Sequence, residues 1–186
     1  MTASSATLRK ATHDDAVAIA NLGASTFKKT FGHSCTPEQM KAYLDEAYSP
    51  EAVAKDMADP NKDTVVAVTT SPVDGHPEQK QEVVVGFVMM TRNSIEPCVE
   101  HVPNKVELQR IYVHHAHHGK GLGTRLARAV EDMAREQGFR HMWLGVWQEN
   151  HPAQIVYEKL GYKVVGEHLF DVGGDLQMDN VMLKEL

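Results

Sequence analysis

A glycine-rich turn joins an apolar segment to an amphipathic one near the middle of the chain. Residues 118–124 read His-Gly-Lys-Gly-Leu-Gly-Thr and follow the apolar segment 106–113. Backbone N–H groups at a helix start lack intrahelical partners, and the helix dipole makes them attractive to anions. The turn therefore predicts a phosphate site, and Glu107 places a carboxylate for chemistry close to it.

Two familiar phosphate-binding patterns do not fit this turn. A P-loop needs Gly-Lys-Ser/Thr four positions after a glycine, and none is present. Gly119, Gly121 and Gly123 are spaced two apart, which departs from the dinucleotide fingerprint. From the turn alone, a purely structural role stays open.

Composition narrows the class of protein. The chain has 186 residues, 42% hydrophobic and 24% charged, which favours one globular domain over residues 1–186. The net charge of −6 disfavours a nucleic-acid partner, and no apolar run approaches the length of a membrane span. Two cysteines cannot form a disulfide framework, and no secretory signal is evident, so we expect a cytoplasmic protein with free thiols.

A histidine cluster precedes the turn. His114, His115, His117 and His118 fit no known zinc spacing and alternate with no cysteine or carboxylate. We therefore expect no metal site.

Strand and helix signals alternate along the chain. Strands are expected at 7–11, 64–70, 83–91, 106–113, 140–147, 162–170 and 177–186. Helices are expected from Asp14 or Asp15 to Gly23, at 37–47, from Pro50 to the break at 59–61, at 121–137 and at 150–160. The polar segment 71–82 is expected to be a long hairpin loop. This order predicts the α/β class, with a mostly antiparallel mixed sheet of about seven strands and helices on both faces.

Two motifs carry a resemblance to a known family. His118–Gly123 resembles the pyrophosphate loop of the GCN5-related N-acetyltransferases (GNAT), whose consensus is Arg or Gln, any two residues, Gly, any residue, then Gly or Ala. His118 occupies the first position of this motif, where the consensus has Arg or Gln. Downstream, Asn150, Ala153, Tyr157 and Leu160-Gly-Tyr resemble the family's second motif. The resemblance covers about residues 7–186 and implies the GNAT fold, splayed between its fourth and fifth strands.

The resemblance also implies acetyl-CoA as the cofactor, with its pantetheine arm lying in the gap between the fourth and fifth strands. The backbone of 111–113 would pair with the arm, and Val146 and Trp147 would flank it. The implied cofactor-binding residues are Ile111, Tyr112, Val113, His118, Gly119, Lys120, Gly121, Leu122, Gly123, Thr124, Val146, Asn150, Ala153 and Tyr157.

Two residues are candidates for proton transfer. Glu107 is the candidate general base, acting directly or through a water, and the alternative is a structural pair with Arg110 or Arg92. Tyr157 is the candidate general acid for the leaving thiolate, and the alternative is a core tyrosine with a satisfied hydroxyl. Strand alternation puts Glu107, Gln109, Ile111 and Val113 on one face, and Val106, Leu108, Arg110 and Tyr112 on the other.

The acceptor is expected to be a primary amine. Segments 36–63 and 166–179 are acidic and could attract a polycation, although they could equally be solvated surface. Residues 26–33, 107–113 and 144–147 look like microbial spermidine/spermine N-acetyltransferases. This closer resemblance assigns Phe27, Phe31, His33 and Trp147 to the acceptor site. It implies a small amine, with polyamines first and protein N-terminal or lysine amines as the alternative.

A CoA-binding sensor without catalysis is the alternative of another class, and the presence of both Glu107 and Tyr157 argues against it. A homodimer is common in the family and stays open here.

Overall fold

The computed structural model describes residues 6–73 and 76–186. It contains one seven-stranded sheet in the spatial order β1-β2-β3-β4-β5-β7-β6. The strands are β1 (Thr7–Lys10), β2 (Lys62–Val73), β3 (His76–Thr91), β4 (Lys105–Val113), β5 (His141–Trp147), β6 (Lys163–Val172) and β7 (Asp175–Glu185). Only β4 and β5 are parallel neighbours, so the predicted mixed, mostly antiparallel sheet is confirmed.

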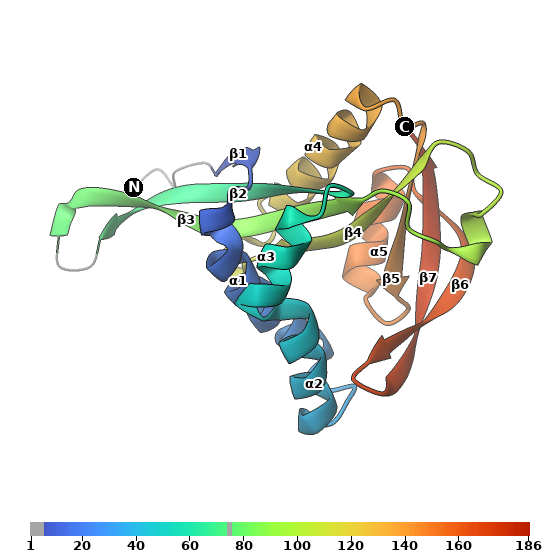
Figure 1. The fold of residues 1–186 in the computed structure, drawn as a ribbon, viewed down its shortest axis with the longest axis horizontal. Coiled ribbons are helices and arrows are strands. Elements are labelled where there is room, and N and C mark those ends of the chain that lie inside the picture. Colours follow the sequence, from blue (N-terminus) through green and yellow to red (C-terminus); the bar gives the residue numbers. More distant parts are fainter. Residues whose placement is uncertain (1–5, 74–75) are drawn as a thin grey trace.

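Helices cover both faces of this sheet (Figure 1). They are α1 (Ala16–Phe31), α2 (Pro37–Tyr48), α3 (Pro50–Ala58), α4 (Leu122–Glu136) and α5 (His151–Lys159). One hydrophobic core joins α4 and α5 to the sheet through Leu126, Val130 and Tyr157. A second joins α1, α2 and α3 to the opposite face through Ile19, Phe27 and Tyr48.

Capping residues explain where the predicted helices begin. The Thr36 hydroxyl accepts a hydrogen bond from the Gln39 N–H, and the Ser49 hydroxyl accepts one from the Ala52 N–H. Proline follows each cap at the first helical position, where its missing N–H costs nothing. The starts of α2 and α3 are therefore set locally by sequence.

The structure corrects two expected boundaries. Helix α1 does not end at Gly23 but continues to Phe31, because Phe27 and its neighbours extend the buried stripe. The expected loop 71–82 is largely strand, since Ser71 pairs with Gln81 and Pro72 with Lys80. The β2–β3 pair therefore extends past the helices as an arm (Figure 1).

Two further findings concern membrane-spanning helices and the cysteines. Within the described residues, no helix is both long and apolar enough to cross a membrane. Cys35 and Cys98 are both free, as expected.

Candidate active site

The glycine turn forms an open N-terminus for α4. Gly121 is the N-cap residue, and both it and Gly119 have φ of 72°, a conformation that glycine adopts without strain. A Cβ atom at either position would meet nothing within 4 Å, so the loop surface is open. The unpaired N–H groups of the first helical turn, from Leu122 to Thr124, lie beside it. This geometry suits a phosphate group.

The polar side chains of the turn form hydrogen bonds to nearby backbone carbonyl groups. Nε2 of His118 is 2.8 Å from the Val113 carbonyl oxygen, and Nζ of Lys120 donates to the Ala116 carbonyl oxygen at 2.9 Å. These bonds tie the turn to the end of β4 and to η3 (His115–His117). An anion here would meet mainly backbone N–H groups, with the Lys120 charge nearby.

The parallel strands β4 and β5 pair over a short distance and then part. Their ladder covers Lys105–Glu107 against His141–Trp143, and no further pair between them occurs among the described residues. Beyond Glu107, strand β4 is bonded only to β3. The expected splay is therefore present. It leaves the backbone edge of Ile111, Tyr112 and Val113 facing a gap that leads toward the glycine turn.

A bulge in β4 overturns the expected alternation of its side chains. Met89 pairs with Arg110 and Met90 with Leu108, so Gln109 is an extra residue in the strand. Val106, Leu108, Ile111 and Val113 consequently all pack toward α4. The expectation that Glu107 shares a face with Ile111 and Val113 is therefore wrong. Glu107 lies on the opposite face, with Arg110 and Tyr112. We call this side of the sheet, which carries Glu107, Arg110 and Trp147, the acceptor face, because Trp147 is among the residues expected to bind the acceptor.

Glu107 is partly buried and forms no ion pair among the described residues. Arg110 instead binds Asp56 at 2.9 Å, and Arg92 binds Asp63, so the structural alternative for Glu107 is not observed. Burial raises the pKa of Glu107, opposed by a hydrogen bond from Ser94 and by the charge of His168. A raised pKa suits a carboxylate that exchanges protons near neutral pH.

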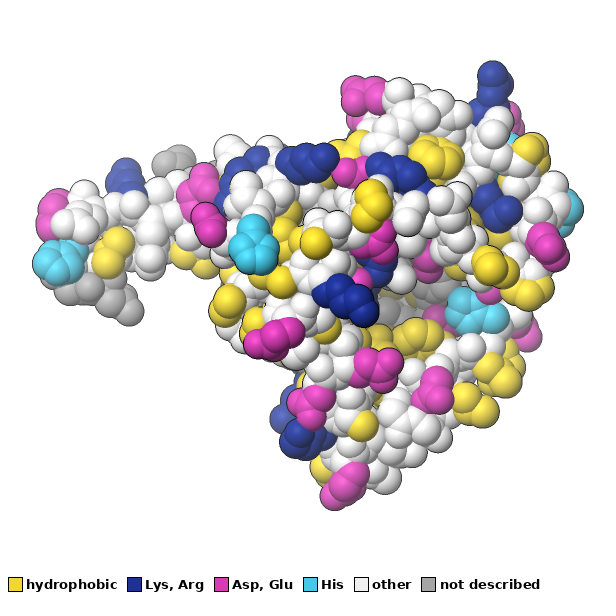
Figure 2. Space-filling view, viewed as in Figure 1, with side chains coloured by type: hydrophobic (Ala, Val, Ile, Leu, Met, Phe, Trp, Pro, Cys, Tyr) yellow, Lys and Arg dark blue, Asp and Glu magenta, His cyan; other side chains and the backbone are white. Residues whose placement is uncertain are grey.

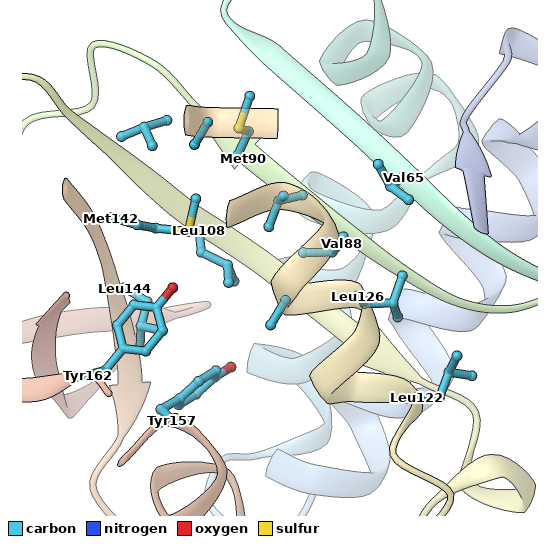
Figure 3. Packing of buried hydrophobic residues seen from close by; sticks show 14 of the residues in the cluster. Val65, Val88, Met90, Leu108, Leu122, Leu126, Met142, Leu144, Tyr157 and Tyr162 are labelled. Carbon is cyan, nitrogen blue, oxygen red and sulfur yellow. The ribbon is translucent and has the colours of Figure 1, made fainter. Parts of the chain in front are cut away.

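Tyr157 reaches the gap from the other side. It lies on α5, is 8% exposed, and extends toward α4 and the strands with its hydroxyl foremost (Figure 3). Its hydroxyl forms no hydrogen bond among the described residues, so the alternative of a satisfied core tyrosine is not observed. Burial raises its pKa, which keeps the hydroxyl protonated and able to donate. Asn150 caps α5 by accepting from the Ala153 N–H, and Val146 packs in the same core.

Aromatic side chains join α1 to β5 on the acceptor face. The Phe31 ring lies 5.0 Å from that of Trp147, and the His33 ring lies 5.7 Å from it. Phe27 is only 2% exposed and stacks beneath Phe31 at 4.2 Å. The structure thus brings Phe31, His33 and Trp147 together, whereas Phe27 supports them from the core and does not line the surface.

The acidic segments 36–63 and 166–179 offer fewer unpaired carboxylates than their sequence suggested. Asp56 binds both Lys62 and Arg110, and Asp63 lies between Lys10 and Arg92. Asp179 differs, because burial raises its pKa to about 6 and His168 is its one salt-bridge partner among the residues that the structure describes. Figure 2 shows that this side of the molecule is hollowed between the α2–α3 helices and the β6–β7 pair.

Sequence reasoning missed Glu96 and His168. In the structure, the His168 ring lies between the carboxylates of Glu96 and Asp179. His168 lies 2.7 Å from Glu96 and 3.8 Å from Asp179. These residues come from three separate segments, and no short pattern links them. The only local signal is the alternation along 163–172, which puts His168 on the same face as Phe170.

The sequence is similar to known acetyltransferases. The sequence model of the acetyltransferase (GNAT) family matches residues 32–162. An uncharacterised N-acetyltransferase of Mycobacterium tuberculosis is 30% identical over 172 residues, which cover 92% of this chain and 98% of that protein. An uncharacterised N-acetyltransferase of Lactobacillus delbrueckii subsp. lactis is 29% identical over 165 residues, covering 89% of this chain and 88% of that protein.

The fold is similar to that of solved acetyltransferases. The PaiA N-acetyltransferase of Thermoplasma acidophilum, in complex with coenzyme A, matches with a TM-score of 0.73 at 20% identity. That match covers 98% of this chain and 99% of the other. YncA of Salmonella typhimurium, with its cofactor acetyl-CoA, matches with a TM-score of 0.67 at 21% identity, covering 98% and 95% of the two chains.

Proposed function

The chain belongs to the GNAT family of acetyltransferases, and from this we propose that it acetylates the primary amine of a small molecule, with polyamines such as spermidine and spermine first. As a member of this family it is an acetyl-CoA-dependent N-acetyltransferase.

The parting of β4 and β5 is the observation that carries this proposal. The gap opens immediately after Glu107 and faces the hydroxyl end of Tyr157. The unpaired edge of Ile111–Val113 offers main-chain groups to an extended arm, and the glycine turn at α4 offers N–H groups to a pyrophosphate. Val146, Asn150 and Ala153 would complete this cradle. When bound, acetyl-CoA supplies an activated acetyl thioester.

Glu107 then acts as a general base on the acceptor side of the gap. A neutral amine that attacks the acetyl group must lose a further proton as the amide forms, so a proton acceptor is needed close to the nitrogen. Glu107 is free of ion pairs among the described residues, and its pKa is raised by burial. It takes the proton directly or through one water.

Tyr157 acts as the general acid on the donor side. A thiolate leaving group is stabilised when a nearby hydroxyl donates a proton to it. Because Tyr157 is buried and its raised pKa keeps it protonated, it holds that proton until the thiolate forms. Glu107 and Tyr157 thus act from opposite faces of the same gap.

The acceptor face has features that suit a cationic chain. Phe31, His33 and Trp147 offer aromatic surface to an alkylammonium group. A cavity of about 280 Å³ beside Trp147 contains the carboxylates of Glu149 and Asp175. An elongated polyamine could place one amine at Glu107 and a second charge in this cavity. A lysine side chain would present only one charge.

Thiol release from acetyl-CoA, followed with a thiol-reactive dye, tests this function. The panel contains spermidine, spermine, monoamines and lysine peptides, each at saturating acetyl-CoA. We expect rapid release with polyamines and slower release with monoamines. Release with peptides alone would keep the mechanism and reject the acceptor, whereas CoA binding without release on the whole panel would favour a sensor.

A further inference from the structure

Three titratable side chains from separate segments align on the acceptor face beyond Glu107. Glu96 precedes η2 (Pro97–Val99), His168 lies on β6, and Asp179 lies on β7. Nδ1 of His168 is 2.7 Å from Oε2 of Glu96, and Nε2 is 3.8 Å from Oδ2 of Asp179. The mechanism proposed above uses none of them.

Glu96 fixes the orientation of the His168 ring. Its side chain is 5% exposed, and its other oxygen accepts the Cys98 N–H at 2.9 Å. Although burial acts to raise it, the hydrogen bonds from Cys98 and His168 hold the pKa of Glu96 below its usual value. An ionised Glu96 accepts the Nδ1 proton, so Nε2 is the nitrogen that faces Asp179.

Gly145 on β5 leaves the room that this arrangement needs. A Cβ atom there would lie 3.1 Å from Cε1 of His168 and 3.2 Å from Oδ2 of Asp179. Gly145 is exposed although Leu144 and Val146 on either side are buried, so β5 is open to the hollow at this point. Two residues earlier, Trp143 pairs with Glu107 at the start of the gap. Asp179 therefore adjoins the proposed site of transfer.

The charges around Asp179 favour a cationic ligand. The charge of His168 on β6 lowers the pKa of Asp179. The charge of Asp179 in turn raises the pKa of Tyr43 on α2 and of Tyr112 on β4. His168 also contacts Glu96, and its charge lowers the pKa of Glu107. No lysine or arginine among the described residues forms an ion pair with Asp179, unlike Asp56 and Asp63. This buried carboxylate therefore lacks a permanent compensating cation, since His168 carries a charge only when it is protonated.

The proton balance of amine acetylation requires the acceptor nitrogen to lose two protons. An ammonium group carries three N–H bonds and the amide product carries one. One N–H bond must break to free the lone pair that forms the C–N bond as the C–S bond breaks, and a second breaks as the amide forms. One of the two protons is balanced by protonation of the leaving thiolate, and the other goes to solvent.

Resting on the proposed function, we propose that Asp179 binds the ammonium group of the acceptor and takes its first proton, while Glu107 takes the second. Asp179 is then a catalytic residue, because it contacts the acceptor nitrogen. His168 and Glu96 are positioning residues. The Nε2 atom of His168 receives the proton from Asp179 once their separation of 3.8 Å shortens to hydrogen-bond distance. Glu96 stabilises the resulting imidazolium, and the 25% exposure of His168 gives that proton a route to solvent.

The kinetic test measures kcat/KM for spermidine from about pH 5 to about pH 9. We expect Asp179→Asn to lower kcat/KM by about 100-fold or more, the usual loss on removing a general base, without changing KM for acetyl-CoA. His168→Gln should move the acidic limb of the profile, and Gly145→Ala should lower kcat/KM by displacing both side chains. Asp132→Asn, an exposed carboxylate on α4, is the matched control and should behave as wild type.

A binding measurement separates this proposal from the transfer reaction itself. Calorimetric titration with spermidine in the presence of CoA should show weaker binding at low pH for the wild type. Binding to Asp179→Asn should be about tenfold weaker at neutral pH and should depend less on pH than binding to the wild type. Thermal denaturation verifies that each variant is folded.

The two proposals fail in different ways. If spermidine binds in this Asp179-dependent manner but no thiol is released, the transfer reaction is wrong and the ammonium site stands. If thiol release depends on Glu107 while Asp179→Asn keeps the wild-type binding and pH profile, the transfer stands and the role of Asp179 is wrong.

Discussion

The rings of Tyr157 and Tyr162 lie 5.9 Å apart and meet edge to face. Both side chains are buried in the core between the sheet and α4, and Figure 3 shows them side by side. The Tyr162 hydroxyl is fully enclosed without a hydrogen-bond partner among the described residues, whereas that of Tyr157 is not enclosed in this way. Two adjacent tyrosines thus differ in whether their hydroxyls can reach a ligand.

This difference predicts opposite outcomes for the same substitution. Tyr157→Phe should lower kcat by about 10²-fold or more, because the thiolate then leaves without a proton donor. Tyr162→Phe should leave kcat unchanged, since its hydroxyl serves no ligand. Single-turnover rates with a saturating amine measure the step directly, and equal rates in the two variants would contradict the assigned role.

Glu107→Gln should lower kcat by about 10² to 10⁴-fold and leave acetyl-CoA affinity nearly unchanged. The amide keeps the shape of the side chain but cannot take a proton from the amine. Steady-state kinetics with spermidine and calorimetry with CoA measure the two quantities separately. Glu100→Gln, at an exposed carboxylate on the preceding loop, serves as the control. A parallel loss of CoA affinity in Glu107→Gln would instead indicate a structural role.

The glycine turn should tolerate a methyl group at Gly123 but not at Gly121. Gly121 has φ of 72°, where an L-residue is strained by about 1–2 kcal/mol, so Gly121→Ala should lower stability and raise KM for acetyl-CoA. Gly123 lies inside α4, and its Cβ would only touch Val113 at 3.9 Å. Gly123→Ala should therefore keep KM and gain up to about 1 kcal/mol of helix propensity. Thermal denaturation and acetyl-CoA titration distinguish the pair, and equal effects would argue against the turn as a phosphate site.

Asp179→Asn should stabilise the protein at alkaline pH. The pKa of Asp179 is raised from 3.8 to about 6, so folding favours the protonated form and ionisation destabilises the fold. Above pH 6 the cost is up to about 3 kcal/mol, and it declines as the pH falls from about 6 toward 4. The amide removes this cost. Melting temperatures of wild type and variant should converge at low pH, and a constant difference would show that the carboxyl is not perturbed.

Much of the fold is readable in the sequence because its signals are local. Thr36-Pro37 and Ser49-Pro50 begin helices by capping, and Gly138 and Gly161 end them with positive φ. The order of strands and helices follows from apolar periodicity. The extension of β2 and β3 through polar residues such as Gln81 was not readable, since that pairing depends on one strand lying beside the other.

The geometry of the candidate site was readable only where it depends on a single element. Gly121 and Asn150 are of this kind, because a turn and a cap depend on nearby backbone. The face of Glu107 was predicted wrongly, since one inserted residue, Gln109, changes the alternation and leaves no mark in composition. His168 was missed because its partners, Glu96 and Asp179, lie on segments that meet only after folding.

Under the proposed function, the gap between β4 and β5 also separates two kinds of molecular recognition. The edge of Ile111–Val113 and the turn at Gly121 present peptide groups, which every amino acid carries, so substitution of many side chains leaves them intact. The acceptor face presents side chains such as Trp147 and Asp179, which substitution alters directly. A lineage with this architecture can change the molecules it modifies while the donor stays the same, and selection for a new acceptor can begin at a few positions on one side of the sheet.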